Sequence, residues 1–86
     1  MTHYNRGLAR IARQDARGAL DDFGQAIRAK PDFPHAYANR GLTRQLLGDI
    51  RGAVADLEMA LKVEPSDWAH RSTVERRLET ARAKLP

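Results

Sequence analysis

The feature that most constrains this chain is an internal repeat. Residues 3–31, shifted by 34 positions, align without a gap on residues 37–65. A period of this size indicates stacked units, because a single unit of this length cannot bury its own apolar face. The positions that coincide are Asn5/Asn39, Arg6/Arg40, Gly7/Gly41, Leu8/Leu42, Arg10/Arg44, Asp15/Asp49, Arg17/Arg51, Gly18/Gly52, Ala19/Ala53, Asp22/Asp56, Ala26/Ala60 and Pro31/Pro65.

Each copy contains two segments typical of amphipathic helices, and one further segment follows the second copy. Prolines lie only at the edges of these segments, and a proline disfavours helical geometry at the residue before it. Gly48 suits a left-handed helix stop. The predicted helices span about residues 3–13, 17–29, 34–47, 50–63 and 68–84. The candidate N-caps are Thr2, Asp15, Asp32, Asp49 and either Ser66 or Asp67.

Length and composition set the class of protein. A chain of 86 residues is one small domain of modest stability. It has no cysteine, which excludes disulfides and thiolate metal ligands. No apolar run approaches the roughly 18 residues that a membrane span needs, so we expect a cytoplasmic protein. The 15 Lys and Arg residues exceed the 11 Asp and Glu residues, and this balance permits anionic partners.

The period and its small residues resemble the tetratricopeptide repeat, a helix–turn–helix unit. The second copy matches that family at Tyr37, Gly41, Gly48, Asp49, Ala53, Leu57, Ala60 and Pro65, and the first at Gly7, Asp15, Ala19, Phe23, Ala26 and Pro31. The resemblance implies an all-α fold, namely a short right-handed α-solenoid of five helices. The single domain, 1–86, would then hold one repeat at 1–33, a second at 34–67 and a capping helix at 68–86, with Trp68 in the core.

Two arginines depart from the family pattern. Arg6 and Arg40 stand where a leucine is usual, and Asp22 and Asp56 follow them at one constant spacing. We therefore expect an Arg6–Asp22 and an Arg40–Asp56 ion pair between the two helices of each repeat, which would fix their register. The pattern assigns no partner to Arg10, Arg44, Arg76 and Arg77, which could rim a groove. The other departures are His3 in place of an aromatic residue and Gln14 in place of the turn glycine.

In the tetratricopeptide family the first helix of each repeat faces a concave groove that binds peptides. Tyr4, Leu8, Ile11 and Ala12 share one helical face. The resemblance implies a mostly apolar groove, in which Asn39 is the polar contact to a partner. The candidate groove residues are Tyr4, Asn5, Leu8, Ile11, Ala12, His35, Ala38, Asn39, Leu42, Gln45, Leu46 and Arg76. Alternatively, these side chains only pack against neighbouring first helices.

The chain shows no arrangement of residues for catalysis. Neither Ser66 nor Ser72 lies in a nucleophile elbow, and no glycine-rich phosphate loop is present. His3, His35 and His70 occupy different positions within the repeat, which argues against a shared zinc site. We expect no enzymatic activity, no metal and no cofactor.

The sequence leaves several functions open. The first hypothesis is a protein-interaction module that binds a peptide or helix of a partner whose identity the sequence does not give. The second is self-association into a homodimer or scaffold, because two repeats fall below the roughly three needed for stability. The chain could also be an excerpt of a longer array. RNA binding is the weakest hypothesis, since the arginines are interspersed with acids and few aromatic residues are available for stacking.

Overall fold

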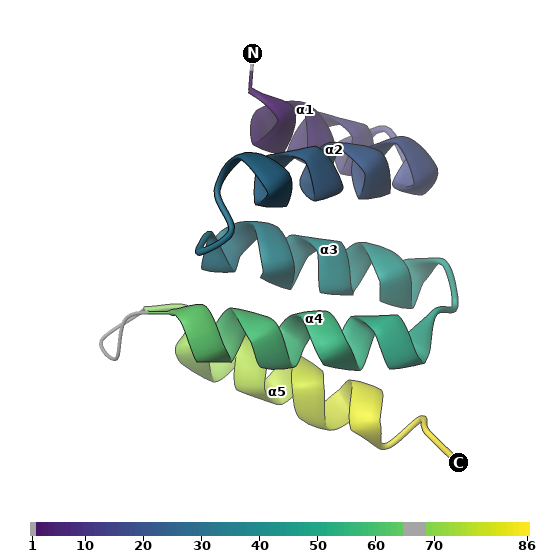
Figure 1. Ribbon diagram of the computed structural model, residues 1–86. Coiled ribbons are helices and arrows are strands. Elements are labelled where there is room, and N and C mark those ends of the chain that lie inside the picture. The colour runs from purple at the N-terminus through teal and green to yellow at the C-terminus, as the bar shows by residue number, and fades with distance from the viewer. Residues whose placement is uncertain (1, 65–68) are drawn as a thin grey trace.

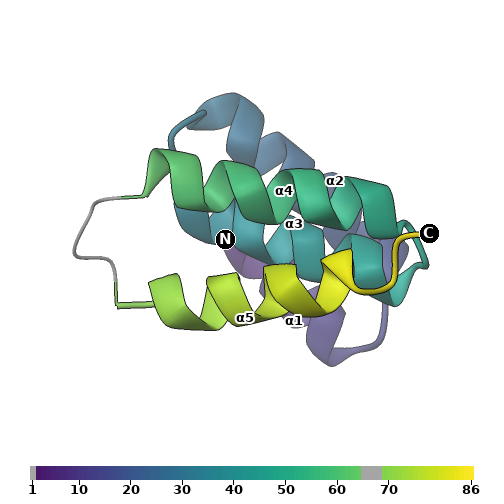
Figure 2. The same ribbon diagram turned by 90° about the horizontal axis from the view of Figure 1, so that it is seen from below.

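The computed structural model describes residues 2–64 and 69–86, and in these ranges the chain is helical without any strand. Each helix packs against the next one in the chain, so that the five elements follow one beneath another (Figure 1). Seen from below, α1 and α5 lie on one side of the molecule and α2 and α4 on the other (Figure 2). The prediction of an all-α chain with five helices is confirmed. The helices are α1 His3–Ala12, α2 Ala16–Ala29, α3 Pro34–Leu46, α4 Ile50–Val63 and α5 Arg71–Arg82.

Short polar side chains start three of these helices. The Thr2 hydroxyl oxygen accepts a hydrogen bond from the backbone N–H of Asn5 at 3.1 Å. Asp15 and Asp49 accept in the same way from the N–H three residues later, at 3.0 Å and 2.9 Å. Each bond satisfies one of the backbone donors that a helix N-terminus leaves free. The three N-caps were predicted at these residues and are confirmed.

The start of α3 differs from the prediction. Its N-cap is Phe33, which makes no side-chain capping bond, and Pro34 occupies the first turn. The expectation that Asp32 caps this helix is therefore wrong. Pro34 explains the difference, because a proline disfavours helical geometry at the residue before it, so that Phe33 stays extended and becomes the N-cap in place of Asp32.

The fifth helix is shorter than the predicted span of 68–84. It begins at Arg71, because Ala69 and His70 form a turn and His70 supplies no capping bond. It ends at Arg82, after which the backbone tightens into bonds between residues three apart. The candidate caps Ser66 and Asp67 and the core candidate Trp68 lie outside the described residues.

Close packing between helices depends on two glycines of the repeat. A Cβ atom at Gly7 would lie 2.7 Å from Phe23 Cε1, and one at Gly41 would lie 3.1 Å from Leu57 Cγ. Phe23 and Leu57 are fully buried. The buried residues form two clusters, and Tyr37 packs against both of them, so the core continues from α2 to α5.

The turn between the two helices of each repeat is left-handed in both copies. Gly48 has a φ of 86°, and Gln14, at the equivalent position, has a φ of 64°. The aspartate that follows each of these residues donates a backbone hydrogen bond of 2.8 Å to an arginine carbonyl: Asp15 to Arg10 in the first turn, and Asp49 to Arg44 in the second. A side chain other than glycine costs about 1–2 kcal/mol in this conformation. The first turn is therefore strained relative to the second.

We predict that Gln14→Gly stabilises the fold by about 1 kcal/mol, because it removes this cost at an exposed position. The reciprocal change, Gly48→Gln, should destabilise it by a similar amount. No atom lies within 4 Å of a Cβ placed at Gly48, so a clash would not contribute. Urea unfolding followed by circular dichroism measures both values. A destabilising effect of Gln14→Gly would contradict the assignment of strain.

Candidate functional site

A buried carboxylate joins the two helices of the first repeat. The Asp22 side chain is fully buried on α2 and receives Arg6 Nη2 at 2.8 Å and Nε at 3.0 Å. Arg10 Nη1 lies 3.2 Å from its second oxygen, Oδ2. Both arginines come from α1. The structure therefore brings the expected Arg6–Asp22 pair together and adds a second arginine to it.

The second repeat reproduces this cluster. Asp56 on α4 receives Arg40 Nη2 at 2.8 Å and Nε at 2.9 Å, and Arg44 Nη1 at 2.9 Å. Arg10 and Arg44, left without a partner by the sequence pattern, are thus internal ion-pair residues, and their assignment to a groove rim is wrong. The sequence held a signal for this role, since each stands twelve residues before its aspartate in both copies.

The electrostatics of the first cluster follow from this geometry. Hydrogen bonds from Arg6 hold the pKa of Asp22 below its usual range, although burial by itself would raise it. The charge of Arg10 lowers this pKa further. Asp22 raises the pKa of the Arg6 guanidinium in turn. The carboxylate is therefore ionised at neutral pH, and its arrangement suits a fixed structural contact between helices.

We predict that Asp22→Asn destabilises the fold by about 2 kcal/mol at pH 7, because the buried side chain loses the negative charge that accepts hydrogen bonds from Arg6. A group whose pKa is lowered by folding contributes stability above its ordinary pKa and loses it as the pH falls through the folded-state pKa. The difference between wild type and variant should therefore shrink below about pH 4. Chemical unfolding at several pH values tests this.

The control for this prediction is Asp21→Asn, which neutralises an exposed carboxylate on the same helix. Surface changes of this kind stay within about 0.5 kcal/mol. An equal effect of the two substitutions, or a difference that is independent of pH, would contradict the role given to Asp22.

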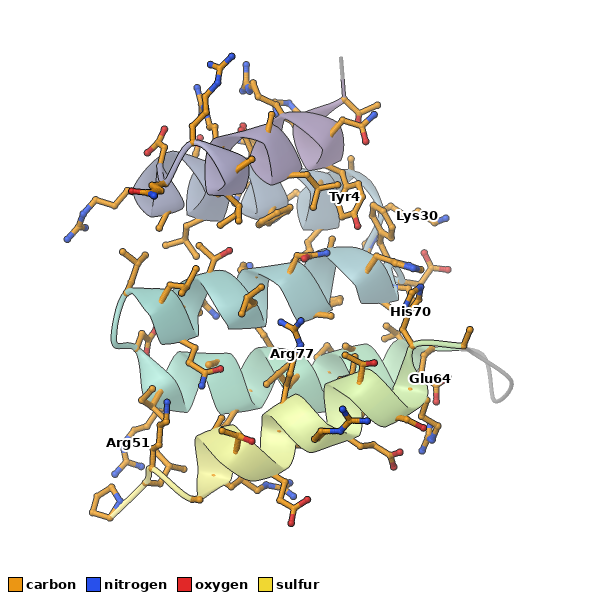
Figure 3. All side chains as sticks on the ribbon, turned by 180° about the vertical axis from the view of Figure 1, so that it is seen from behind. Tyr4, Lys30, Arg51, Glu64, His70 and Arg77 are labelled. Atoms are coloured by element: carbon orange, nitrogen blue, oxygen red, sulfur yellow. The ribbon has the colours of Figure 1, made fainter. Side chains whose placement is uncertain are left out.

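A hollow of about 250 Å³ opens where α1, α3 and the start of α5 meet. Figure 3 shows Tyr4, His70 and Arg77 around it, contributed by segments far apart in the chain. The lining is more polar than the mostly apolar groove that the sequence predicts, since only Ala38 and Val74 lack a polar side-chain group. The lining residues are Tyr4, His35, Ala38, Asn39, His70, Thr73, Val74 and Arg77.

Asn39 positions Tyr4 at the edge of this hollow. Its side-chain nitrogen donates to the Tyr4 hydroxyl oxygen at 3.1 Å and to the His35 backbone carbonyl at 2.9 Å. The Tyr4 ring packs against Phe33, with ring centroids 4.7 Å apart. Burial raises the pKa of Tyr4, an effect that the bond from Asn39 partly opposes. The Asn39 amide nitrogen is thus engaged inside the protein, although the sequence indicated a polar contact for a partner.

Two of the three histidines meet in the hollow. The rings of His35 and His70 lie edge to face, with centroids 5.0 Å apart. Burial lowers the pKa of His35, and the charge of His70 lowers it further. His3 lies elsewhere, with Nδ1 3.7 Å from Asp22 Oδ1. His35 and His70 thus come together although they occupy different positions within the repeat, whereas His3 lies apart from them.

A second hollow, of about 280 Å³, adjoins the first and shares Thr73 and Arg77 with it. Its other lining residues are Gln45, Arg76 and Thr80. Among the residues that the structure describes, no Asp or Glu lines either of these two hollows. Six of the predicted groove residues line neither one: Asn5, Leu8, Ile11, Ala12, Leu42 and Leu46.

The sequence indicated only part of the contribution of α5 to the two hollows. It named Arg76 as a groove residue and Arg77 as a residue that could rim the groove, but it did not name Thr73, Val74 or Thr80. A further step of 34 residues from Asn39 reaches Thr73, so extending the repeat into α5 would have found this residue.

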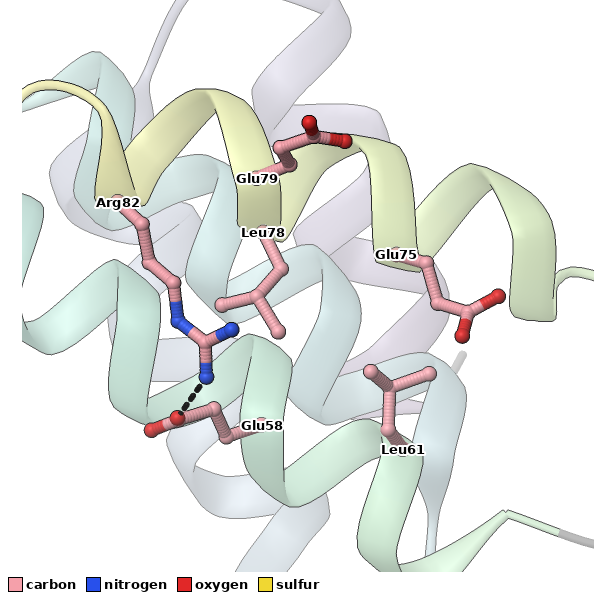
Figure 4. A pocket seen from close by; sticks show the side chains of 6 residues that line it. All are labelled: Glu58, Leu61, Glu75, Leu78, Glu79 and Arg82. Atoms are coloured by element: carbon pink, nitrogen blue, oxygen red, sulfur yellow. Dashed lines mark hydrogen bonds and ion pairs between the residues drawn. The ribbon is translucent and has the colours of Figure 1, made fainter.

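The opposite face of α5 borders a different hollow, shown in Figure 4. Glu75 and Glu79 flank Leu78 there, and Arg82 forms an ion pair with Glu58 on α4. Glu75 stands one 34-residue step after Gly41, at the position where a glycine admits the next helix. Glu75 therefore replaces the small residue that this position has in both copies of the repeat.

In the part of the chain that the structure describes, no group of three or more His, Asp or Glu side chains could hold a metal ion. Among the same residues, no helix combines the length and the apolar character that crossing a membrane requires. No family model matches the chain, and no curated protein sequence matches it.

Proposed function

We propose that this chain is a non-enzymatic protein-interaction module of two tetratricopeptide-like repeats and a capping helix, arranged as a short right-handed solenoid. The equivalence of the two copies supports this proposal. Asp22 and Asp56 bind arginines at the same spacings, and the turns at Gln14 and Gly48 share a left-handed conformation. Consecutive packing of the helices agrees with a stack of repeated units.

We further propose that the groove formed by the two adjoining hollows binds a peptide or helix of a partner protein. The observation that carries this proposal is the lining, which comes from α1, α3 and α5 together. This lining combines hydrogen-bonding side chains such as Thr73 and Arg77 with the apolar side chains of Ala38 and Val74, as binding grooves commonly do. We call this surface the α1–α3–α5 groove; it comprises the lining residues of the two hollows.

We predict that Thr73→Trp abolishes peptide binding, because Thr73 lines both hollows and a bulky ring would fill them. Peptides selected from a random display library on the wild-type protein provide the ligands. Their affinities for the variant should fall at least about tenfold, equivalent to about 1.4 kcal/mol.

The matched control is Ala55→Trp, which places the same ring at an exposed site on α4. It should leave the affinities unchanged. Equal binding to the Thr73→Trp variant, with the helical circular-dichroism signal intact, would show that the selected peptides bind elsewhere.

Self-association is the second candidate function, and an open apolar surface favours it. A hollow of about 470 Å³ lies beside His3. The equivalent position in the second copy of the repeat holds a larger side chain, Tyr37. Its lining is mostly apolar and includes Ala26, Ala29 and Phe33. Exposed apolar surface of this kind commonly marks an interface.

If self-association is the function, Ala29→Glu should shift a concentration-dependent dimer toward monomer, because it places a charge in this apolar surface. Sedimentation velocity over a wide range of concentrations measures the shift. A monomer at every concentration would exclude this second function and leave the peptide-binding proposal in place.

A further inference from the structure

We propose that the apolar hollow beside His3 binds an aromatic side chain of a partner protein, at the position that Tyr37 fills within the second repeat. The hollow lies between the start of α1 and the end of α2. Of its lining residues, only Tyr4 also lines the α1–α3–α5 groove. The inference therefore goes beyond the proposed groove, since it assigns a second site and the chemical class of its ligand.

The second repeat shows what occupies the equivalent position. A step of 34 residues takes His3 to Tyr37 and Ala26 to Ala60. Tyr37 packs against the core cluster that contains Ala60, and Ala60 is fully buried. In the first repeat the side chain of His3 is 51% exposed, and Ala26 keeps 7% of its surface exposed. The smaller His3 therefore leaves open a place that the second copy of the repeat fills with an aromatic ring.

The walls of the hollow suit such a ring. Ala26 and Ala29 contribute methyl groups from α2, while Tyr4 and Phe33 contribute aromatic rings. These two rings are tilted by 49° with their centroids 4.7 Å apart, and aromatic rings favour tilted and edge-to-face contacts at such separations. The volume of about 470 Å³ falls within the range of pockets that hold small ligands. The hollow is therefore large enough for one aromatic side chain.

Cations near the hollow complement the negative face of an aromatic ring. In the second repeat, Arg40 Cζ lies 5.7 Å from the centroid of the Tyr37 ring. The counterpart Arg6 lies beside His3, with its Nη2 3.4 Å from His3 Nδ1. The Arg6 side chain is 46% exposed, against 21% for Arg40. Lys30 also lines the hollow and adds a second cation (Figure 3). Because cations attract the π electrons of a ring, these charges favour an aromatic over an aliphatic ligand.

The aromatic side chains that the structure describes are engaged within the chain itself. Phe23 is fully buried, and Tyr37 packs against both core clusters. Tyr4 and Phe33 contact each other and form walls of the hollow. We therefore assign the incoming ring to a different protein. The self-association candidate uses the same hollow, so a second copy of the chain is the alternative occupant that the experiment must separate.

The experiment uses N-acetyl-phenylalaninamide as the probe and N-acetyl-cyclohexylalaninamide as its saturated match, which lacks π electrons. Methyl NMR spectra of alanine-labelled protein report on Ala26 and Ala29 in the hollow, with the exposed Ala83 as internal control. We expect the aromatic probe to bind with a dissociation constant of about 1 mM, as suits a ligand of its size. The saturated match should bind at least about threefold more weakly.

Two results of this titration would overturn the inference. The first is that the signals of Ala26 and Ala29 move no more than that of Ala83 at the highest concentration of the aromatic probe. The second is equal affinity for the two compounds, which would reduce the site to unspecific apolar surface.

A variant of His3 tests the site from inside the chain. His3→Tyr gives the first repeat the ring of the second, so it should fill the hollow and weaken binding of the aromatic probe at least about tenfold. It should also raise the midpoint of thermal unfolding by about 4 °C, because the added ring buries apolar surface. The matched control is Ala55→Tyr, which places the same ring at an exposed site on α4 and should change neither value. Unchanged binding to His3→Tyr, with the helical circular-dichroism signal intact, would overturn the site.

Sedimentation velocity identifies the occupant. A wild-type protein that remains monomeric and binds the aromatic probe supports a ring from another protein. A wild-type dimer that His3→Tyr converts to a monomer, together with unmoved Ala26 and Ala29 signals on addition of the probe, would assign the hollow to a second copy. That result would overturn the inference.

The outcomes also separate this inference from the proposed groove. If library-selected peptides depend on Thr73 but the aromatic probe leaves Ala26 and Ala29 unmoved, the groove stands and the ring site is overturned. If the probe binds the hollow beside His3 and no selected peptide depends on Thr73, the ring site stands and the groove is overturned.

Discussion

The buried carboxylates of Asp22 and Asp56 are the contacts on which the rest of this structure depends. Each one holds two arginines of the preceding helix across a helix pair, at distances of 2.8 to 3.2 Å. A carboxylate with several directional donors tolerates little sliding of one helix along the other. This fixed register brings Gly7 against Phe23 and Gly41 against Leu57, which allows the close approach that the small core needs.

Most of the fold could be predicted from the sequence, because its determinants are local or repeated. Caps such as Asp15 and Asp49 act within three residues, and a constant spacing indicated the Arg6–Asp22 and Arg40–Asp56 pairs. The errors concern helix ends at which the sequence signal for a cap was weak or was overridden by a neighbouring residue. Pro34 displaced Asp32 as the determinant of a helix start, and α5 lacks a strong signal at either end, so its length was overestimated.

The site was less predictable, because it depends on contacts between distant segments. The sequence placed Tyr4, His35, Ala38 and Asn39 in a groove, and they line one hollow. It could not show that Asn39 donates to Tyr4, thirty-five residues away, because this bond depends on how α1 and α3 are offset. Likewise, the meeting of His35 and His70 depends on the turn before α5, where the helix begins later than the pattern indicated.

The two faces of α5 explain how one short helix can both pack on the core and line the proposed groove. Its buried residues Val74, Leu78 and Ala81 join the core of the second repeat. On one side of this stripe, Glu75 replaces the glycine that both copies of the repeat have at this position. On the other side, Arg77 is directed toward α3 and adds positive charge to the lining of the hollow (Figure 3). Because the same apolar stripe anchors both faces, a change that loosens α5 should weaken the packing of the second repeat and the proposed groove together.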